Sequence, residues 1–241
     1  MNLNSLEQII FIKGYNFLYQ PLWNWTPVDM SIEKNTKEDF DSLRERFKNR
    51  INLILPEVNS SGTFIDMGCN IGWNSFEIYD KGGTVVGVDN SYRDIHFIPI
   101  TEYLIDYHKL DRNRISFVDS RIQEYFDENK TIYDYCICLL LIHHYLWEGY
   151  GPASNHKRII ESHTDKFFTE DGRRLMDTIY QRCNIAAFLQ LRFHVDKELD
   201  GKPYELFVDY LINEIGFSDV KVLSSDDFIY GEEAVIYKCI K

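Results

Sequence analysis

Apolar residues recur at helical spacing over residues 37–55. They are Phe40, Leu43, Phe47, Ile51 and Ile54. Positions three and four apart lie on one face of a helix, so this segment is predicted to be an amphipathic helix. Pro56 and the Ser-Ser-Gly turn after it predict where the helix ends.

From residue 63 onward, short apolar runs alternate with amphipathic segments. Seven strands are expected, at residues 63–68, 84–89, 115–120, 133–142, 173–179, 218–223 and 234–240. Helices are expected at 73–82, at 92–110 with a break near Pro99, around 156–168, and over most of 184–215 with a break at 201–203. Strands that alternate with helices pair in parallel, whereas the last two strands have no helix between them and should pair antiparallel. The pattern predicts an α/β fold: a seven-stranded, mostly parallel Rossmann-like sheet with an antiparallel last strand and helices on both faces.

Composition narrows the class of protein. The 241-residue chain is 44% hydrophobic and 15% aromatic, which indicates a folded globular protein. Its longest apolar run, residues 136–142, is far too short for a membrane span. The N-terminus has neither a basic region before its apolar patch nor a small-residue cleavage pattern, so no signal peptide is expected.

The cysteines and the net charge indicate the compartment and the partners. Five cysteines, an odd number mostly in apolar segments, favour buried free thiols and a cytoplasmic protein. A net charge of -12 disfavours sequence-independent binding to nucleic acid, which depends on many contacts from Lys and Arg to phosphate. A local basic groove for nucleic acid is compatible with this charge but is not favoured.

One turn carries the candidate chemistry. The stretch FIDMGCNIGWNSFE, residues 64–77, runs from a strand through Gly68 and Gly72 into a helix. Glycine lets the backbone approach a ligand closely, and Asn70 is among the few other residues that tolerate left-handed geometry. Asp89 ends the next strand, and its carboxylate could accept hydrogen bonds from both hydroxyls of a ribose.

Two kinds of ligand compete for such a turn. A dinucleotide would place its pyrophosphate at the helix N-terminus, usually with the pattern G-x-G-x-x-G, which is absent here. S-adenosylmethionine has no phosphate and carries a sulfonium, an ammonium and a carboxylate. An acid at the end of the first strand, Asp66, and a mixed polar turn suit that charge pattern better.

Six segments in order resemble the motifs of class I S-adenosylmethionine-dependent methyltransferases. They are FIDMGCNIGWNSFE, VVGVDN, ISFVDSRIQEY, IYDYCICLLLIHHYL, DGRRLMDT, and GFSDVKVL with AVIYKCIK. The commonest form of the first motif has glycine where Asn70 stands, and DGRRLMDT stands where GG-x-L-x-x-E is usual. The resemblance covers residues 38–241, which are expected to form the methyltransferase domain.

The resemblance implies a role for each matching position. The methionine moiety of the cofactor would contact Asp66, Gly68, Cys69, Asn70 and Gly72. Asp89 would bind the ribose with Asn90 at its edge, Asp119 and Ser120 would bind the adenine, and Leu139 would lie below the sulfonium. S-adenosyl-L-homocysteine would be the product.

Other candidate residues surround these. His143 and His144 follow the fourth strand, where an imidazole could take a proton from a hydroxyl or amine nucleophile. The histidines show no tight metal-ligand pattern, so no metal is expected. Arg44 or Arg46 could bind the cofactor carboxylate through a bidentate guanidinium contact, and the sequence does not decide between them.

Residues 1–37 precede the expected domain and form an aromatic, partly helical segment. In similar enzymes such a segment covers the cofactor and shapes the acceptor pocket, and Tyr19 and Gln20 are its polar candidates for acceptor contact. Ordinary packing of its aromatic residues against the sheet is the equal alternative.

The sequence therefore predicts a methyltransferase acting on an O (or N) atom of a small-molecule or glycan acceptor. The turn and the histidine pair are also similar to those of enzymes that methylate a terminal phosphate, which would need arginines such as Arg173, Arg174, Arg182 and Arg192. The alternatives are an RNA or tRNA methyltransferase, a non-catalytic protein that binds S-adenosylmethionine, and a nicotinamide-dependent oxidoreductase. The sequence does not indicate an oligomeric state.

Overall fold

The computed structural model describes residues 23, 37–90, 97–139, 141–145, 168–192, 202–223, 228–229 and 232–241. The strands in this part of the chain are β1 (Thr63–Met67), β2 (Thr84–Asp89), β3 (Ile115–Asp119), β4 (Tyr133–Cys138), β5 (Cys183–Arg192), β6 (Asp219–Leu223), β7 (Phe228–Ile229) and β8 (Glu232–Ile240). The longer helices are α2 (Lys37–Ile54), α3 (Trp73–Asp80), α4 (Phe97–His108), α5 (Ile122–Glu128), α6 (Glu170–Arg182) and α7 (Lys202–Tyr210). Three short helical turns join them, η1 (Leu55–Glu57), η2 (Ile142–Tyr145) and η4 (Leu211–Ile215).

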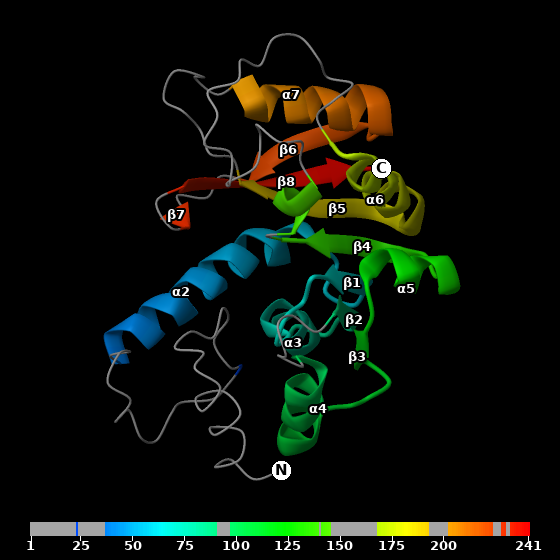
Figure 1. Ribbon diagram of the computed structural model, residues 1–241. Helices are drawn as coiled ribbons and strands as arrows, with labels where there is room; N and C mark the ends of the chain where they lie inside the picture. Colours follow the sequence, from blue (N-terminus) through cyan, green and yellow to red (C-terminus); the bar gives the residue numbers. More distant parts are fainter. Residues whose placement is uncertain are drawn as a thin grey trace.

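The strands form one sheet in the order β3-β2-β1-β4-β5-β8-β6, which Figure 1 shows from β3 near the bottom to β6 near the top. Strands β1 to β5 pair in parallel, and β8 pairs antiparallel with both β5 and β6. The two-residue strand β7 pairs with β8 and was not predicted. The prediction of a seven-stranded, mostly parallel sheet with an antiparallel last strand is confirmed.

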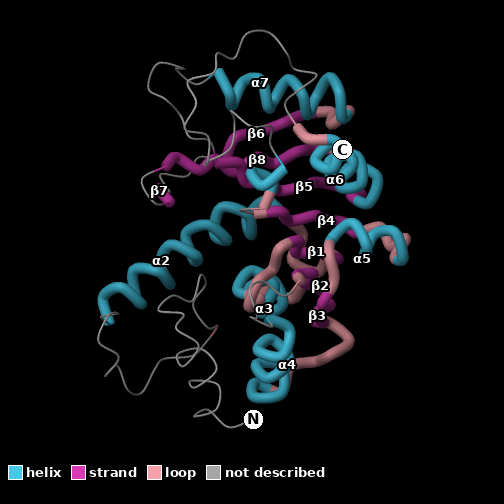
Figure 2. Tube along the Cα trace, viewed as in Figure 1, coloured by secondary structure: helices cyan, strands magenta, loops and turns pink. Residues whose placement is uncertain are grey.

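Helices cover both faces of the sheet (Figure 2). One apolar core lies between the sheet and α2, α3 and α4, and a second lies between the sheet and α5, α6 and α7. Residues along each strand alternate between the two cores because successive side chains in a strand point to opposite faces. The prediction of helices on both faces of the sheet is therefore confirmed.

The prediction for the fifth strand was wrong. Residues 173–179 belong to helix α6, and the fifth strand β5 occupies residues 183–192, which were predicted to be helical. Thr169 caps α6, since its side chain accepts a hydrogen bond from the backbone N–H of Gly172, and Leu175, Met176 and Ile179 are buried at helical spacing. The fifth motif of the resemblance, DGRRLMDT, thus lies on a helix.

The run that forms β5 is almost continuously apolar, so periodicity alone does not distinguish a strand from a buried helix. Its place between β4 and β8 gives both of its edges hydrogen-bonding partners and buries both of its faces. Such two-sided burial is typical of a central strand.

Smaller differences concern the ends of elements. The fourth strand ends at Cys138 rather than at residue 142, and α5 was not predicted. Helix α4 begins at Phe97 and runs through Pro99, because proline in the first turn lacks an N–H that would have no helical partner there. The helix expected around residues 156–168 lies almost wholly outside the described residues.

Two other expectations bear on the class of protein. All five cysteines are free and buried, as predicted. Among the helices that the structure describes, none is both long and apolar enough to span a membrane.

Candidate functional site

The turn between β1 and α3 has left-handed backbone at three positions. The φ angles are 72° at Gly68, 52° at Asn70 and 83° at Gly72. The side chain of Asn70 stabilises this shape, since its Oδ1 accepts a hydrogen bond of 2.8 Å from the backbone N–H of Ile71. The interpretation of Asn70 as a tolerated left-handed residue is confirmed.

Gly72 is also required for space. An added Cβ at Gly72 would lie 2.6 Å from Cζ of Phe117 and 3.0 Å from Cε2 of Phe76. The ring of Phe117 in turn lies against Gly87 of β2, where an added Cβ would be 2.5 Å from Cδ1. The ring of Phe117 therefore packs directly against the turn. The sequence did not indicate this contact, because Phe117 lies in an apolar strand.

Asp66 faces inward. It is 1% exposed, and its Oδ2 accepts a 2.7 Å hydrogen bond from Oγ of Ser75 in α3. Burial raises the pKa of Asp66 to about 6, although the hydrogen bond from Ser75 opposes that rise. Asp66 thus joins β1 to the first turn of α3 from behind the turn.

Asp89 ties the turn to the second strand. Its Oδ2 accepts a 2.7 Å hydrogen bond from the backbone N–H of Asn70. Burial raises the pKa of Asp89 to about 6, against the opposing effect of the hydrogen bond from Asn70, and the nearby charge of Asp119 adds to the rise. Two carboxyl groups of raised pKa, Asp66 and Asp89, therefore lie on either side of one turn.

Asp119, the last residue of β3, lies beside Asp89 of β2. Asp119 pairs in register with Asp89, and the backbone N–H of Ser120 donates to the carbonyl oxygen of Asp89 at 3.0 Å. Asp119 is exposed, as is Asn90. The carboxyl ends of β1, β2 and β3 therefore gather the acids that the sequence predicted.

Leu139 follows β4 and is 7% exposed, in the core shared with α3. Leu141, two residues on, lies over the glycine turn, since its Cβ is 3.5 Å from where a Cβ on Gly68 would be. Sequence reasoning missed Leu141, because an apolar residue in an apolar run carries no distinguishing signal. Cys69 is fully buried between the turn and the core.

The structure describes the remaining predicted residues only in part. His143 and His144 lie in η2, which begins four residues after β4 ends at Cys138, and the side chain of His144 is exposed. Tyr19, Gln20 and the side chain of His143 lie outside the described part of the chain.

Helix α2 carries both candidate arginines, Arg44 and Arg46, and both are half-buried. The ring of Phe47 on the same helix makes an edge contact with Trp73, the first residue of α3, at 6.3 Å between centroids. Arg44 lies three positions from Phe47 and so shares its side of the helix, which favours Arg44 over Arg46 as the residue nearer the turn.

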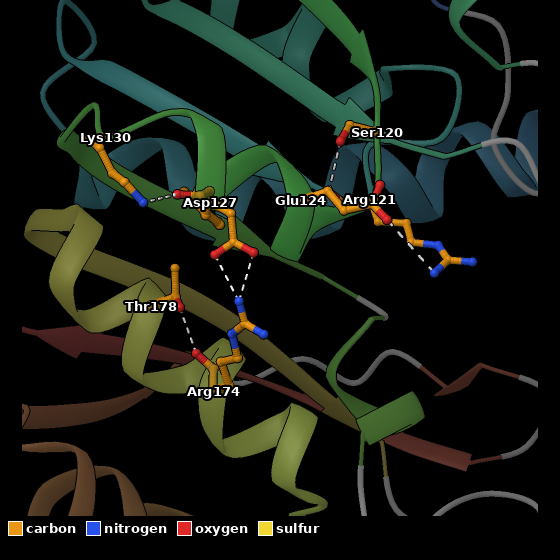
Figure 3. Close-up of polar contacts among 8 residues, drawn as sticks. Ser120, Arg121, Glu124, Asp127, Lys130, Arg174 and Thr178 are labelled. Atoms are coloured by element: carbon orange, nitrogen blue, oxygen red, sulfur yellow. Dashed lines mark hydrogen bonds and ion pairs between the residues drawn. The ribbon is translucent and has the colours of Figure 1, made fainter.

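Two arginines considered for a phosphate-bearing acceptor are engaged elsewhere. Arg174 of α6 donates to both carboxylate oxygens of Asp127 in α5, at 2.8 and 2.7 Å, as Figure 3 shows. Arg182 donates to the carbonyl oxygen of Lys130 at 3.0 Å. These contacts join α6 to α5 and to the loop that follows α5, on the face of the sheet opposite α3.

Among the residues that the structure describes, no group of three or more His, Cys, Asp or Glu side chains is placed to hold a metal ion.

The fold can be compared with solved structures. WbdD, described as a bifunctional kinase-methyltransferase, matches over 99% of this chain and 46% of its own, with a TM-score of 0.63 and 18% identity. Magnesium protoporphyrin IX methyltransferase from Synechocystis PCC 6803, solved with bound SAM, matches over 82% of this chain and 78% of its own, with a TM-score of 0.54 and 15% identity. The chain has the class I methyltransferase fold.

A third solved structure, EvdMO1, matches over 83% of this chain and 41% of its own, with a TM-score of 0.54 and 12% identity. The chain thus spans less than half the length of WbdD and of EvdMO1. By sequence, no protein-family model and no curated protein matches it.

Proposed function

We propose that the chain is an S-adenosylmethionine-dependent methyltransferase that acts on an O (or N) atom of a small-molecule or glycan acceptor. The observation that carries the proposal is the left-handed turn from Gly68 to Gly72, held between the carboxyl groups of Asp66 and Asp89. Carboxylates beside the turn favour a cationic ligand and disfavour the diphosphate of a dinucleotide.

The residues present fit such a cofactor. The N-cap of α3 is Gly72, which has no capping side chain, so the positive end of the helix dipole lies directly at the turn. Asp89 is only partly buried and would bind the ribose, with Asp119 and Ser120 toward the adenine. We assign the methionine carboxylate to Arg44, the space below the methyl group to Leu139, and the packing over the turn to Leu141.

When bound, the cofactor supplies an electrophilic methyl group, and the part of the protein is to orient the acceptor, exclude water and accept a proton. We assign the proton to His143 or His144, since both lie in η2 on the segment that leaves the carboxyl end of β4 and an unperturbed imidazole is mostly neutral at physiological pH. Tyr19 and Gln20 remain the proposed acceptor contacts from the N-terminal segment. The free cysteines support a cytoplasmic protein.

Calorimetry with S-adenosylmethionine and S-adenosylhomocysteine tests the proposal. Both should bind, and Asp89→Asn should weaken both by roughly 10- to 100-fold, because a hydrogen bond to a charged group contributes about 1.5–3 kcal/mol. Asp177→Asn is the matched control, since Asp177 is exposed on α6. Absence of binding by the folded wild-type protein contradicts the proposal, and binding of NADH instead would indicate an oxidoreductase.

Two further measurements address the other candidate functions. RNA affinity that falls steeply with salt concentration would favour an RNA or tRNA methyltransferase, because each neutralised phosphate releases counterions. Cofactor binding without methyl transfer to any acceptor would favour a non-catalytic binding protein.

A further inference from the structure

Gln190 of β5 is a buried amide with no hydrogen-bond partner among the residues that the structure describes. Its side chain is 0% exposed, and neither Oε1 nor Nε2 has a partner. Buried side-chain amides are almost always hydrogen-bonded, because an unsatisfied one loses its bonds to water without compensation. An unsatisfied amide of this kind requires an explanation, and a bound ligand that completes its hydrogen bonds is one.

The direction of Gln190 follows from the alternation along β5. Leu189 and Leu191 lie in the core under α5, α6 and α7, whereas Phe188 lies in the core under α2, α3 and α4. Gln190 therefore points to the same face of the sheet as Phe188. This is also the face of Asp66, which is covered by α3 through the hydrogen bond from Ser75.

The register of the sheet places Gln190 beside the proposed cofactor site. Asp66 of β1 pairs with Ile137 of β4, and Ile137 pairs with Phe188 of β5, so these three residues form one row across neighbouring strands about 4.8 Å apart. Gln190 lies two residues beyond Phe188 along β5, just past the last pair between β4 and β5, Cys138 with Leu189. Gln190 therefore lies at the end of the sheet where β1 leads into Gly68 and β4 leads into Leu139.

The proposed cofactor extends from Gly68 away from β4, toward Asp89 on β2 and Asp119 on β3. A group that receives the methyl must approach from the other side, over β4 and β5. We propose that Gln190 binds the acceptor there, through a neutral group that both donates and accepts a hydrogen bond, such as a hydroxyl of a polyol. This inference rests on the proposed function and narrows its acceptor.

The hydrogen-bonding atoms of the Gln190 side chain favour a neutral hydroxyl over an anionic group. Oε1 accepts and Nε2 donates, and a hydroxyl can satisfy either atom. A phosphate dianion only accepts, so it would satisfy Nε2 but place negative oxygens against Oε1. Because a site built to bond a hydroxyl rejects groups that leave it unpaired, Gln190 favours a neutral acceptor over a terminal phosphate.

Gln190→Met tests this, because methionine has a similar length and no polar atom to leave unsatisfied. The melting temperature of the ligand-free protein should stay unchanged or rise by roughly 2 to 8 °C, since an uncompensated amide is removed. Binding of S-adenosylhomocysteine should be unchanged. A fall of more than about 5 °C would mean that the fold itself needs Gln190, and it would overturn the proposal.

Acceptor binding is measured by saturation-transfer NMR on protein loaded with S-adenosylhomocysteine. The probes are glucose, galactose and myo-inositol, with glucose 6-phosphate as the anionic comparison. Gln181→Met is the matched control, since Gln181 is exposed on α6. At least one neutral probe should bind the wild type and the control, bind more tightly than the phosphate, and bind the Gln190→Met protein at least ~10-fold more weakly.

Three results would overturn the inference: no neutral probe binds, the phosphate binds more tightly, or the Gln190→Met protein binds the neutral probe as the wild type does. Failure of the proposed function is seen separately, as absence of S-adenosylhomocysteine binding by the wild type.

Discussion

Replacing Gly72 by alanine should destabilise the protein for two separable reasons. The residue has a φ of 83°, where an L side chain is strained by about 1–2 kcal/mol. The added Cβ would also lie 2.6 Å from the ring of Phe117. That ring also packs closely on Gly87, where an added Cβ would lie 2.5 Å from Cδ1, so it has little room to move, and overpacking of a core costs about 1–3 kcal/mol.

The free energy of unfolding of Gly72→Ala should therefore fall by about 2–5 kcal/mol in urea denaturation. Gly82→Ala is the matched control: its φ is 108°, but the nearest atom to an added Cβ is the carbonyl oxygen of Ser60 at 3.6 Å. It should show only the backbone part, about 1–2 kcal/mol.

A second substitution isolates the steric part. Phe117→Leu creates space below Gly72, so the double variant should be less destabilised than the sum of the two single variants by about 1 kcal/mol or more. Equal losses for Gly72→Ala and Gly82→Ala, together with additivity in the double variant, would refute the packing argument. Loss of S-adenosylhomocysteine affinity in Gly72→Ala protein that is still folded would further link the turn to the cofactor.

Three other predictions concern charge and packing. Burial raises the pKa of Asp66 from 3.8 to about 6, so between these two values the folded state retains a proton that the unfolded state loses. The free energy of unfolding should therefore fall by about 2 kcal/mol more in the wild type than in Asp66→Asn between pH 4 and 7. Arg174→Ala removes an exposed ion pair with Asp127, so the free energy of unfolding in urea should fall by less than about 1 kcal/mol and the cofactor affinity should not change. A clear loss of cofactor affinity would instead place Arg174 in the site. Trp23 is 4% exposed and its ring stacks on Phe76 at 5.2 Å between centroids. The free energy of unfolding should therefore fall by about 3–5 kcal/mol in Trp23→Ala but by only about 1 kcal/mol in Trp23→Phe, which keeps an aromatic ring. Similar losses in both variants would contradict this packing role of the ring.

The sequence alone predicted the features that depend on neighbouring residues. The turn from Gly68 to Gly72 was recognisable because left-handed backbone requires glycine or a residue such as Asn70. The acids at the ends of β2 and β3 and the amphipathic helix α2 were visible for the same reason, since strand ends and helical spacing are local properties.

Only the tertiary structure decided the features that depend on distant residues. Residues 183–192 are a strand because β4 and β8 occupy both edges of that segment, and no local pattern shows those partners. Asp66 is turned inward because Ser75 meets it from α3. Gln190 could be recognised as a candidate only once its burial and its place near the carboxyl end of β5 were known, because burial and strand register are set by segments far apart in the chain.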